Sequence, residues 1–218
     1  MSDQVPSTGS AREFVPEKPT LPRMREAVQG CRGCELYANA TQAVFGEGST
    51  GAEIMLVGEQ PGDKEDLAGA PFVGPAGKLL DAALEAAGID RSLAYVTNVV
   101  KHFKWKRMPS GGKRRLHDKP NAYEITACRP WLEAEIAQVR PRILVCLGAT
   151  AAQALIGKTF RVSRDRGRFY QSDLGPSITA TVHPSAILRA DDRETEMAGL
   201  VDDLRQVAAK LEELQAAG

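Results

Sequence analysis

Length, composition and charge set the first limits on this chain. Its 218 residues fit one domain with a tail, its 43% hydrophobic content is enough for a core, and its 28 acidic and 28 basic residues leave no net charge to indicate a partner. No apolar run is long enough to span a membrane and no signal pattern begins the chain, so we expect a cytoplasmic protein with no membrane partner.

The first predicted segment is a disordered tail over residues 1–22, which hold four prolines and few large apolar groups. A single domain over residues 23–214 follows. Its first motif is a Cys-x-x-Cys pair, Cys31 and Cys34. Two thiolates at this spacing can hold one metal centre from a tight turn. A thioredoxin-type redox pair is the alternative, but it needs a preceding strand, and none is predicted before Cys31.

A buried strand is predicted over residues 53–57, and a helix begins near Pro75 and stops at Gly88. The polar, glycine-rich stretch between them is far longer than the usual connection of about 2–6 residues. Loops that follow the strands of an open α/β sheet bind ligands. We therefore expect a ligand-binding loop here, in preference to a plain connection.

Three further strands are predicted over residues 94–98, 142–147 and 177–182. One helix begins after the second strand, at a capping box formed by Asn121 and Glu124. Another begins at residue 149, and the last carries an apolar stripe from residue 197 to 214. Strands that alternate with helices predict an α/β fold: one three-layer α/β/α domain around a central four-stranded parallel sheet.

Polar side chains follow three of these strands. Glu59 and Gln60 come after the first strand, Asn98 ends the second, and His183 follows the fourth. Because parallel strands end at the same edge of a sheet, we expect these four side chains to line one pocket.

Residues 101–119 form a basic insertion loop, with eight Lys or Arg residues, one acid at Asp118, and Phe103 and Trp105 among the cations. Cations interleaved with aromatic side chains are typical of contact with nucleic-acid phosphates. A solvated charged loop is the alternative.

Four motifs then combine. They are Gly-Glu-Gln-Pro-Gly-Asp at 58–63, Pro-Phe-Val-Gly-Pro-Ala-Gly at 71–77, Lys-Arg-Arg-Leu-His at 113–117 and His-Pro-Ser at 183–185. Together the chain from Cys31 to the last helix resembles the iron–sulfur branch of the uracil-DNA glycosylase superfamily and is similar to the family-four enzymes. The insertion at 113–117 more narrowly resembles UdgX, the branch that becomes covalently attached to uracil-containing DNA. Leu116 replaces the usual isoleucine, and Asp118 replaces the usual next residue.

The resemblance implies a 4Fe–4S cluster with a structural role. Its ligands would be Cys31, Cys34, Cys128 and His102, the histidine standing where the iron–sulfur glycosylases have a cysteine. Cys146 on a buried strand is the alternative fourth ligand, zinc is the alternative metal, and core packing is the alternative role of Cys128.

The resemblance also assigns roles in the pocket. Phe72 would stack on a flipped uracil, Asn98 would read its edge, and Gln60 and Asp63 would line the pocket. His183 would stabilise negative charge on the departing uracil, and Glu59 would orient a nucleophile or stabilise the sugar cation. The residues expected to contact DNA are Lys113, Arg114, Arg115, Ser185 and Arg189.

The function implied is a uracil-DNA glycosylase that traps itself. After excision, the neutral imidazole of His117 would attack C1′ of the sugar, leaving a single-turnover covalent adduct. The expected partner is uracil-containing DNA, single-stranded in the first place and double-stranded as the alternative, bound by a monomer. An ordinary turnover glycosylase and a non-catalytic, metal-bearing nucleic-acid-binding module are the two rival functions.

Overall fold

The computed structural model describes residues 9–108, 115–172, 174 and 177–217. The first half contains the 3-10 helices η1 (Ala11–Phe14), η2 (Val28–Gly30), η3 (Glu35–Ala38) and η4 (Arg91–Leu93), the helices α1 (Leu21–Ala27), α2 (Asp63–Ala68) and α3 (Pro75–Ala86), and the strands β1 (Ile54–Gly58) and β2 (Ala94–Asn98). The second half contains β3 (Trp105–Arg107), β4 (Arg115–His117), α4 (Ala122–Val139), β5 (Ile143–Leu147), α5 (Ala149–Leu155), α6 (Val162–Asp165), β6 (Ser177–Thr181), α7 (Pro184–Ile187) and α8 (Arg193–Ala216).

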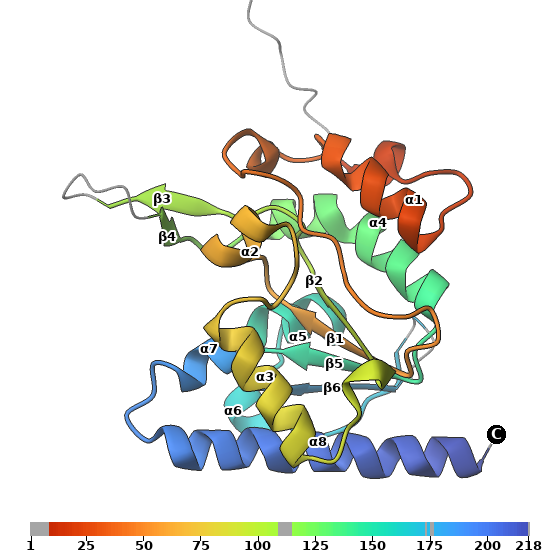
Figure 1. Cartoon of the computed structure of the whole chain (residues 1–218), viewed down its shortest axis with the longest axis vertical. Helices are drawn as coiled ribbons and strands as arrows, with labels where there is room; N and C mark the ends of the chain where they lie inside the picture. The colour runs from red at the N-terminus through yellow and green to blue at the C-terminus, as the bar shows by residue number, and fades with distance from the viewer. Residues whose placement is uncertain (1–8, 109–114, 173, 175–176, 218) are drawn as a thin grey trace, which may run out of the picture.

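The central sheet confirms the predicted fold class. Four parallel strands lie in the order β2-β1-β5-β6, and helices cover both faces (Figure 1). Every residue of β1, β2 and β5 is buried, as expected for strands packed on both sides.

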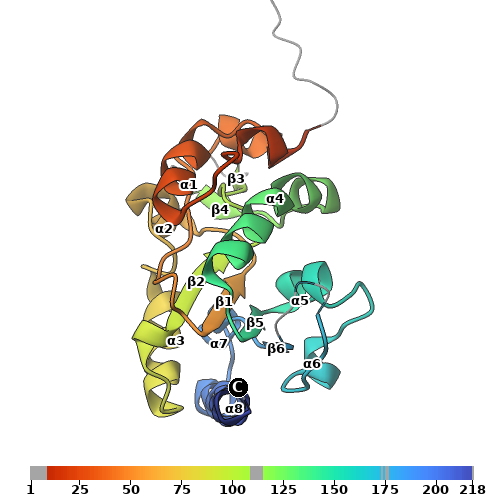
Figure 2. The same ribbon diagram turned by 90° about the vertical axis from the view of Figure 1, so that its right-hand side faces the viewer.

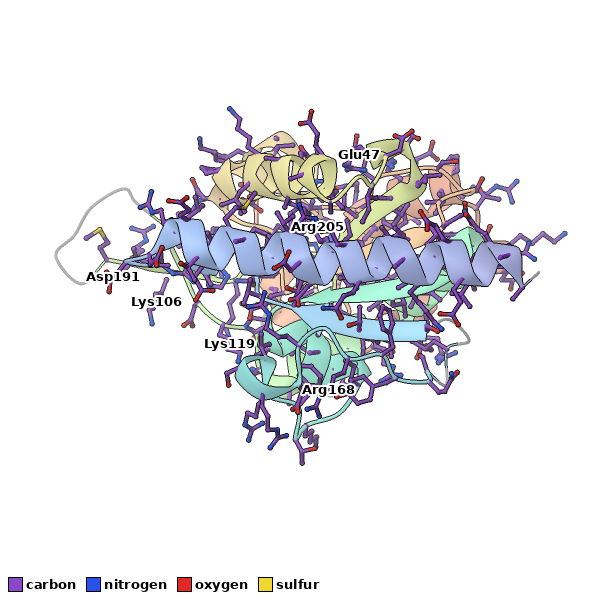
Figure 3. The ribbon with its side chains drawn as sticks, turned by 90° about the horizontal axis from the view of Figure 1, so that it is seen from below. Glu47, Lys106, Lys119, Arg168, Asp191 and Arg205 are labelled. Atoms are coloured by element: carbon purple, nitrogen blue, oxygen red, sulfur yellow. The ribbon has the colours of Figure 1, made fainter. Side chains whose placement is uncertain are left out.

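Alternate residues of each strand enter two separate cores. Met55 and Val57 pack with α1, α4 and α5 on one face, whereas Ile54 and Leu56 pack with α3, α7 and α8 on the other. Figure 2 shows α4 and α8 on opposite sides of the sheet. Figure 3 shows α8 along the underside of the molecule with Arg205 on its outer surface.

The register of the sheet brings the carboxyl ends of the strands level. Gly58 of β1 pairs with Asn98 of β2, and Leu147 of β5 pairs with Thr181 of β6. The residues just beyond these ends therefore meet along one edge.

The helix boundaries follow local chemistry. Asn121 and Glu124 form the predicted capping box at the start of α4. Pro75 occupies the first turn of α3, and Gly88, with a φ of 76°, follows its end.

Of the predicted disordered tail, residues 1–8 lie outside the described residues, and residues 9–22 are folded. They include η1 and the start of α1, and Ala11 and Leu21 are only 1% and 7% exposed. The proline count was misleading because Pro22 serves as a helix-starting residue in the first turn of α1.

The predicted insertion loop is partly a hairpin. Trp105 pairs with His117 and Arg107 pairs with Arg115 in an antiparallel ladder that projects from the body of the domain (Figure 1). Among the described residues, no helix combines the length and apolar character that crossing a bilayer requires.

Candidate functional site

A cavity of about 600 Å³ lies at the carboxyl edge of the sheet. The sequence-predicted residues in its wall are Glu59, Gln60, Phe72, Asn98, His117, His183, Ser185 and Arg189. Glu65, Lys119 and Thr150 also line it, and none of the three was predicted as a site residue. The side chains expected at this edge thus share one cavity with the histidine of the insertion.

The loop after β1 is folded around the carboxylate of Glu65. Its two oxygens accept hydrogen bonds from the backbone N–H groups of Gly62, at 3.1 Å, and Gly74, at 2.6 Å. One side chain therefore joins the two halves of the loop. This clamp encloses α2 and the turn that contains Phe72.

Phe72 is held in a strained backbone conformation beside Asn98. Its φ of 55° lies in the left-handed region, which side chains larger than glycine rarely adopt. A Cβ atom at Gly58 would lie 2.9 Å from the Phe72 ring and would also collide with the Asn98 amide. The bare backbone at Gly58 therefore lets a ring and an amide approach each other across the floor of the cavity.

The turn that contains His183 determines which ring nitrogen carries the proton. The backbone N–H of Ser185 donates to Nδ1 at 3.1 Å, so the proton of the neutral ring lies on Nε2. Burial lowers the pKa of His183 to about 4, and Arg189 and His117 add to the shift. The ring is thus a neutral hydrogen-bond donor in the cavity wall, and it stacks towards Phe72 with ring centres 6.2 Å apart.

His117 lies beside a carboxylate. Its Nε2 is 3.3 Å from Oε1 of Glu59, and the hydroxyl of Thr150 donates to Oε2 of the same carboxylate. Burial lowers the pKa of His117 below its ordinary value, and Glu59 opposes that shift. The imidazole is therefore neutral at neutral pH and retains a nitrogen lone pair.

Gln60 fastens the His117 strand to the cavity. Its Oε1 accepts from the N–H of Lys104 at 2.9 Å, while its Nε2 donates to the carbonyls of Lys104 and Asp118 at 3.2 and 2.9 Å. The same Nε2 lies 2.9 Å from Nε2 of His117. The two hydrogens of this amide already have the two carbonyls as acceptors, so His117 Nε2 is an acceptor only in the tautomer that carries its proton on Nδ1.

Arg115 does not line the cavity, unlike Ser185 and Arg189 of the predicted DNA-contacting set. It pairs with Asp63 at 2.6 Å and with Asp66 at 2.5 Å, and its side chain is 16% exposed. Asp63 and Arg115 therefore join the hairpin to α2 and do not line the cavity. Lys113 and Arg114 lie outside the described residues.

Three of the four expected cluster ligands share one buried region. Cys31, Cys34 and Cys128 belong to the same core, and the pKa of the Cys128 thiol, raised mainly by burial, also responds to Cys31 and Cys34. The indole N–H of Trp131 donates to Cys31 Sγ and the backbone N–H of Lys101 donates to Cys128 Sγ, both at 3.3 Å. N–H donors aimed at sulfur suit ligating thiolates.

His102 and Cys146 differ as candidates for the fourth position. His102 follows Lys101, whose N–H contacts Cys128, and burial lowers the pKa of its imidazole to about 4, so it is neutral. Cys146 lies inside the sheet, opposite Val57 on one neighbour and Ala180 on the other. His102 is therefore the better-placed ligand.

The same side chains suit two kinds of metal centre. Three cysteines and a histidine can ligate zinc or a 4Fe–4S cluster. Within the described ranges, no three His, Cys, Asp or Glu side chains are gathered tightly enough to hold a metal ion. Iron content and visible absorption therefore distinguish the two centres.

Comparison with known proteins identifies the family. A model of the uracil DNA glycosylase superfamily matches residues 45–205, which is most of the chain and includes the whole cavity. The chain belongs to the uracil-DNA glycosylase superfamily. It is 38% identical over 177 residues to the type-4 uracil-DNA glycosylase of Thermotoga maritima, covering 81% of this chain and 86% of that protein. It is 36% identical over 176 residues to the type-4 enzyme of Pyrobaculum aerophilum, covering 78% and 85%.

The superfamily match begins after Cys31 and Cys34 and contains Cys128 and His102.

Thr150 could have been found from the sequence by the rule that located His183. It follows the end of a predicted parallel strand by three residues and so falls at the same edge.

Proposed function

We propose that this chain is a uracil-DNA glycosylase that excises uracil and then captures the abasic sugar through His117. The observation that carries the proposal is the contact between His117 Nε2 and Glu59 Oε1, at 3.3 Å, in the wall of the cavity that also holds Asn98 and His183. The relatives named type-4 uracil-DNA glycosylases support the excision step.

Base recognition begins with extrusion of the uridine, because a base inside a duplex is out of reach. Phe72 would stack on the flipped ring at the cavity floor. The Asn98 amide can donate and accept at once, which matches the O4 and N3–H groups of uracil. Asn98 is 3% exposed, so its amide is shielded from competing water.

Bond cleavage moves the electron pair of the C1′–N1 bond onto the uracil ring. The proton on His183 Nε2 supports a role as donor to the oxygen on which this charge accumulates. Because the ring is neutral, it donates a hydrogen bond without transferring its proton to the leaving group. The sugar left behind is an oxocarbenium-like cation.

Capture follows when the lone pair of His117 Nε2 forms a bond to C1′. The product is an imidazolium, which loses its Nδ1 proton to solvent, while the uracil anion gains one from solvent. Glu59 is the nearest carboxylate to the reacting nitrogen and would stabilise first the sugar cation and then the imidazolium. Each chain would therefore react once.

DNA would be held at the cavity mouth by cations and a hydroxyl. Arg189, Lys119 and Ser185 line the cavity. They would contact phosphates beside the flipped nucleotide. Lys113 and Arg114 stay predicted contacts from the same insertion. Single-stranded uracil-DNA is the proposed preferred substrate, bound by a monomer, because an unpaired base needs no strand separation.

A 4Fe–4S cluster held by Cys31, Cys34, Cys128 and His102 completes the proposal. When bound, it would cross-link the amino-terminal segment to α4 and to the residues that follow β2. The reaction above uses no electron from it.

The decisive experiment mixes the protein with a uracil-containing single strand and separates the products under heat and detergent. The wild type is expected to give a protein–DNA band and no more than one excised uracil per chain. His117→Ala is expected to give no such band and continued release of uracil, because water then takes the sugar.

The rival functions give different products in the same assay. Free abasic DNA in excess of wild-type protein would support an ordinary turnover glycosylase, the reaction that the names of the relatives describe. No release of uracil would support a non-catalytic binding module. An undiminished band from His117→Ala would point to another nucleophile.

A further inference from the structure

Glu59 is held from two sides by different elements. Its Oε1 faces His117 of β4, and its Oε2 accepts a hydrogen bond from the hydroxyl of Thr150 in the first turn of α5. Thr150 is 6% exposed and lines the cavity. When one oxygen of a carboxylate is held by a hydrogen bond, the direction of the other oxygen is fixed as well.

Thr150 is itself rigidly placed. Gly148, with a φ of 88°, turns the chain from β5 into α5, and its N–H donates to the carbonyl of Thr181 at 2.9 Å. Its carbonyl accepts from the N–H of Ala152 at 3.2 Å, which fixes the first turn of α5. A Cβ atom at Gly148 would stand 2.9 Å from Cβ of His183, so this one turn places Thr150 and packs against His183.

We propose that Thr150 is a positioning residue that directs the Glu59 carboxylate towards His117 and the anomeric carbon. The inference rests on the proposed roles of Glu59 and His117. Without the hydroxyl, the carboxylate could rotate about its terminal bond and turn Oε1 away from the reacting nitrogen. Misplacement of a reacting group by about 1 Å can cost about 100-fold in rate.

The test uses one substitution at two buried threonines. Thr150→Val keeps the shape and removes the hydroxyl, and Thr150→Ser keeps the hydroxyl. Thr179→Val is the matched control, because Thr179 Oγ1 is buried and has no hydrogen-bond partner among the described residues. Each variant is mixed in excess with labelled uracil-DNA, and uracil release, covalent adduct and free abasic DNA are measured together with DNA affinity.

Thr150→Val is expected to lower the rate of adduct formation by about 10- to 100-fold at unchanged DNA affinity and to release a larger share of free abasic DNA. Thr150→Ser should restore both the rate and the share, and Thr179→Val should match the wild type. In a Glu59→Ala background, Thr150→Val should have no further effect, because no carboxylate remains to be directed.

A Thr150→Val protein that forms adduct at the wild-type rate would overturn the inference, as would an additional loss in the Glu59→Ala background. Failure of the proposed function is a separate result, since it shows in the wild type as no adduct at all. Uracil release by the Thr150 variants would then still report whether Glu59 needs the hydroxyl.

Discussion

The two histidines of the cavity are neutral, and the proposed function gives them opposite tasks. The proton of His183 lies on Nε2, because the N–H of Ser185 donates to Nδ1. His117 Nε2 lies 2.9 Å from Gln60 Nε2 and 3.3 Å from Glu59 Oε1, and it has a lone pair to offer in the tautomer with the proton on Nδ1. In the proposed function, the His183 ring donates to a departing anion while the His117 ring attacks a cation.

The pH dependence of capture follows from the protonation of His117. Only the neutral ring has a lone pair, and burial holds the pKa of His117 below its ordinary value of about 6.5. The rate of adduct formation is therefore expected to be flat at neutral and mildly alkaline pH and to fall only below about pH 6.5. The measurement is single-turnover adduct formation over a pH series. An adduct rate already falling above about pH 7 would contradict the placement of His117 beside buried groups.

The fourth cluster ligand can be tested at single residues. His102→Ala is expected to lose the visible absorption and iron of the purified protein, whereas His102→Cys should keep both because thiolate is the common ligand. Cys146→Ala is the control and should retain its iron, since this thiol lies between strands of the sheet. Iron content per chain and the visible spectrum are measured beside the circular dichroism of each variant. Iron loss from Cys146→Ala alone would reverse the assignment.

At the scale of elements, the β3–β4 hairpin is attached to the domain by side chains at several points. Arg115 pairs with Asp63 and Asp66 of α2, and the indole N–H of Trp105 donates to the carbonyl of Asn39 at 2.8 Å. The guanidinium of Arg115 also lies over the rings of Phe103 and Trp105. These contacts hold the strand that delivers His117.

Arg115→Ala is expected to slow adduct formation by about 10- to 100-fold, because the strand of His117 loses its attachment to α2. Uracil release should fall less, since Asn98 and His183 keep their places. Lys106→Ala is the matched control: its pair with Asp118 is exposed, with 64% of the lysine side chain accessible.

Limited chymotrypsin cleavage at the aromatic residues of the hairpin checks the mechanism, and Arg115→Ala should be cut faster. If Arg115→Ala instead weakens DNA binding with a reduced salt dependence, Arg115 serves as a phosphate contact, as the sequence alone suggested.

At the scale of the whole molecule, a buried ion pair links the two functional regions. Lys101 and Glu135 are fully buried and lie 2.5 Å apart. The Lys101 ammonium also donates to the carbonyl of Asn98 at 2.9 Å, and its backbone N–H donates to Cys128 Sγ. Glu135 in turn accepts from Tyr95 and from the N–H of Gly46. Lys101 therefore contacts both the expected cluster site and the end of β2 that carries Asn98.

Lys101→Met is expected to lower the free energy of unfolding by about 3–5 kcal/mol, because it leaves the Glu135 charge buried without a partner. The double variant Lys101→Met, Glu135→Gln should recover part of this loss, since a neutral amide is less costly to bury. Urea denaturation midpoints measure both. Arg91→Ala, which breaks an exposed pair with Asp81, is the control and should cost under about 1 kcal/mol. A single variant as stable as the double would contradict the burial of a charged pair.

The parts that the sequence predicted are those encoded locally. Short apolar runs predicted the four strands of the sheet, and parallel order then brought Glu59, Asn98 and His183 to one edge. The pairing of Arg115 with Asp63 and Asp66 joins residues 52 and 49 positions apart, so a local charge pattern could show only a basic loop. Burial of η1 and α1 likewise depends on contact with α4, which no local pattern encodes.

The hairpin has one consequence for engineering. In the proposed function, capture depends on the hairpin and base reading depends on the sheet edge, so we expect the two activities to be separable. A graft of residues 103–118 onto a turnover relative would need the recipient to acquire an amide at the position of Gln60 and carboxylates at those of Asp63 and Asp66, since these form the socket. A graft that lacked these three side chains would carry the histidine but would not hold it in the cavity.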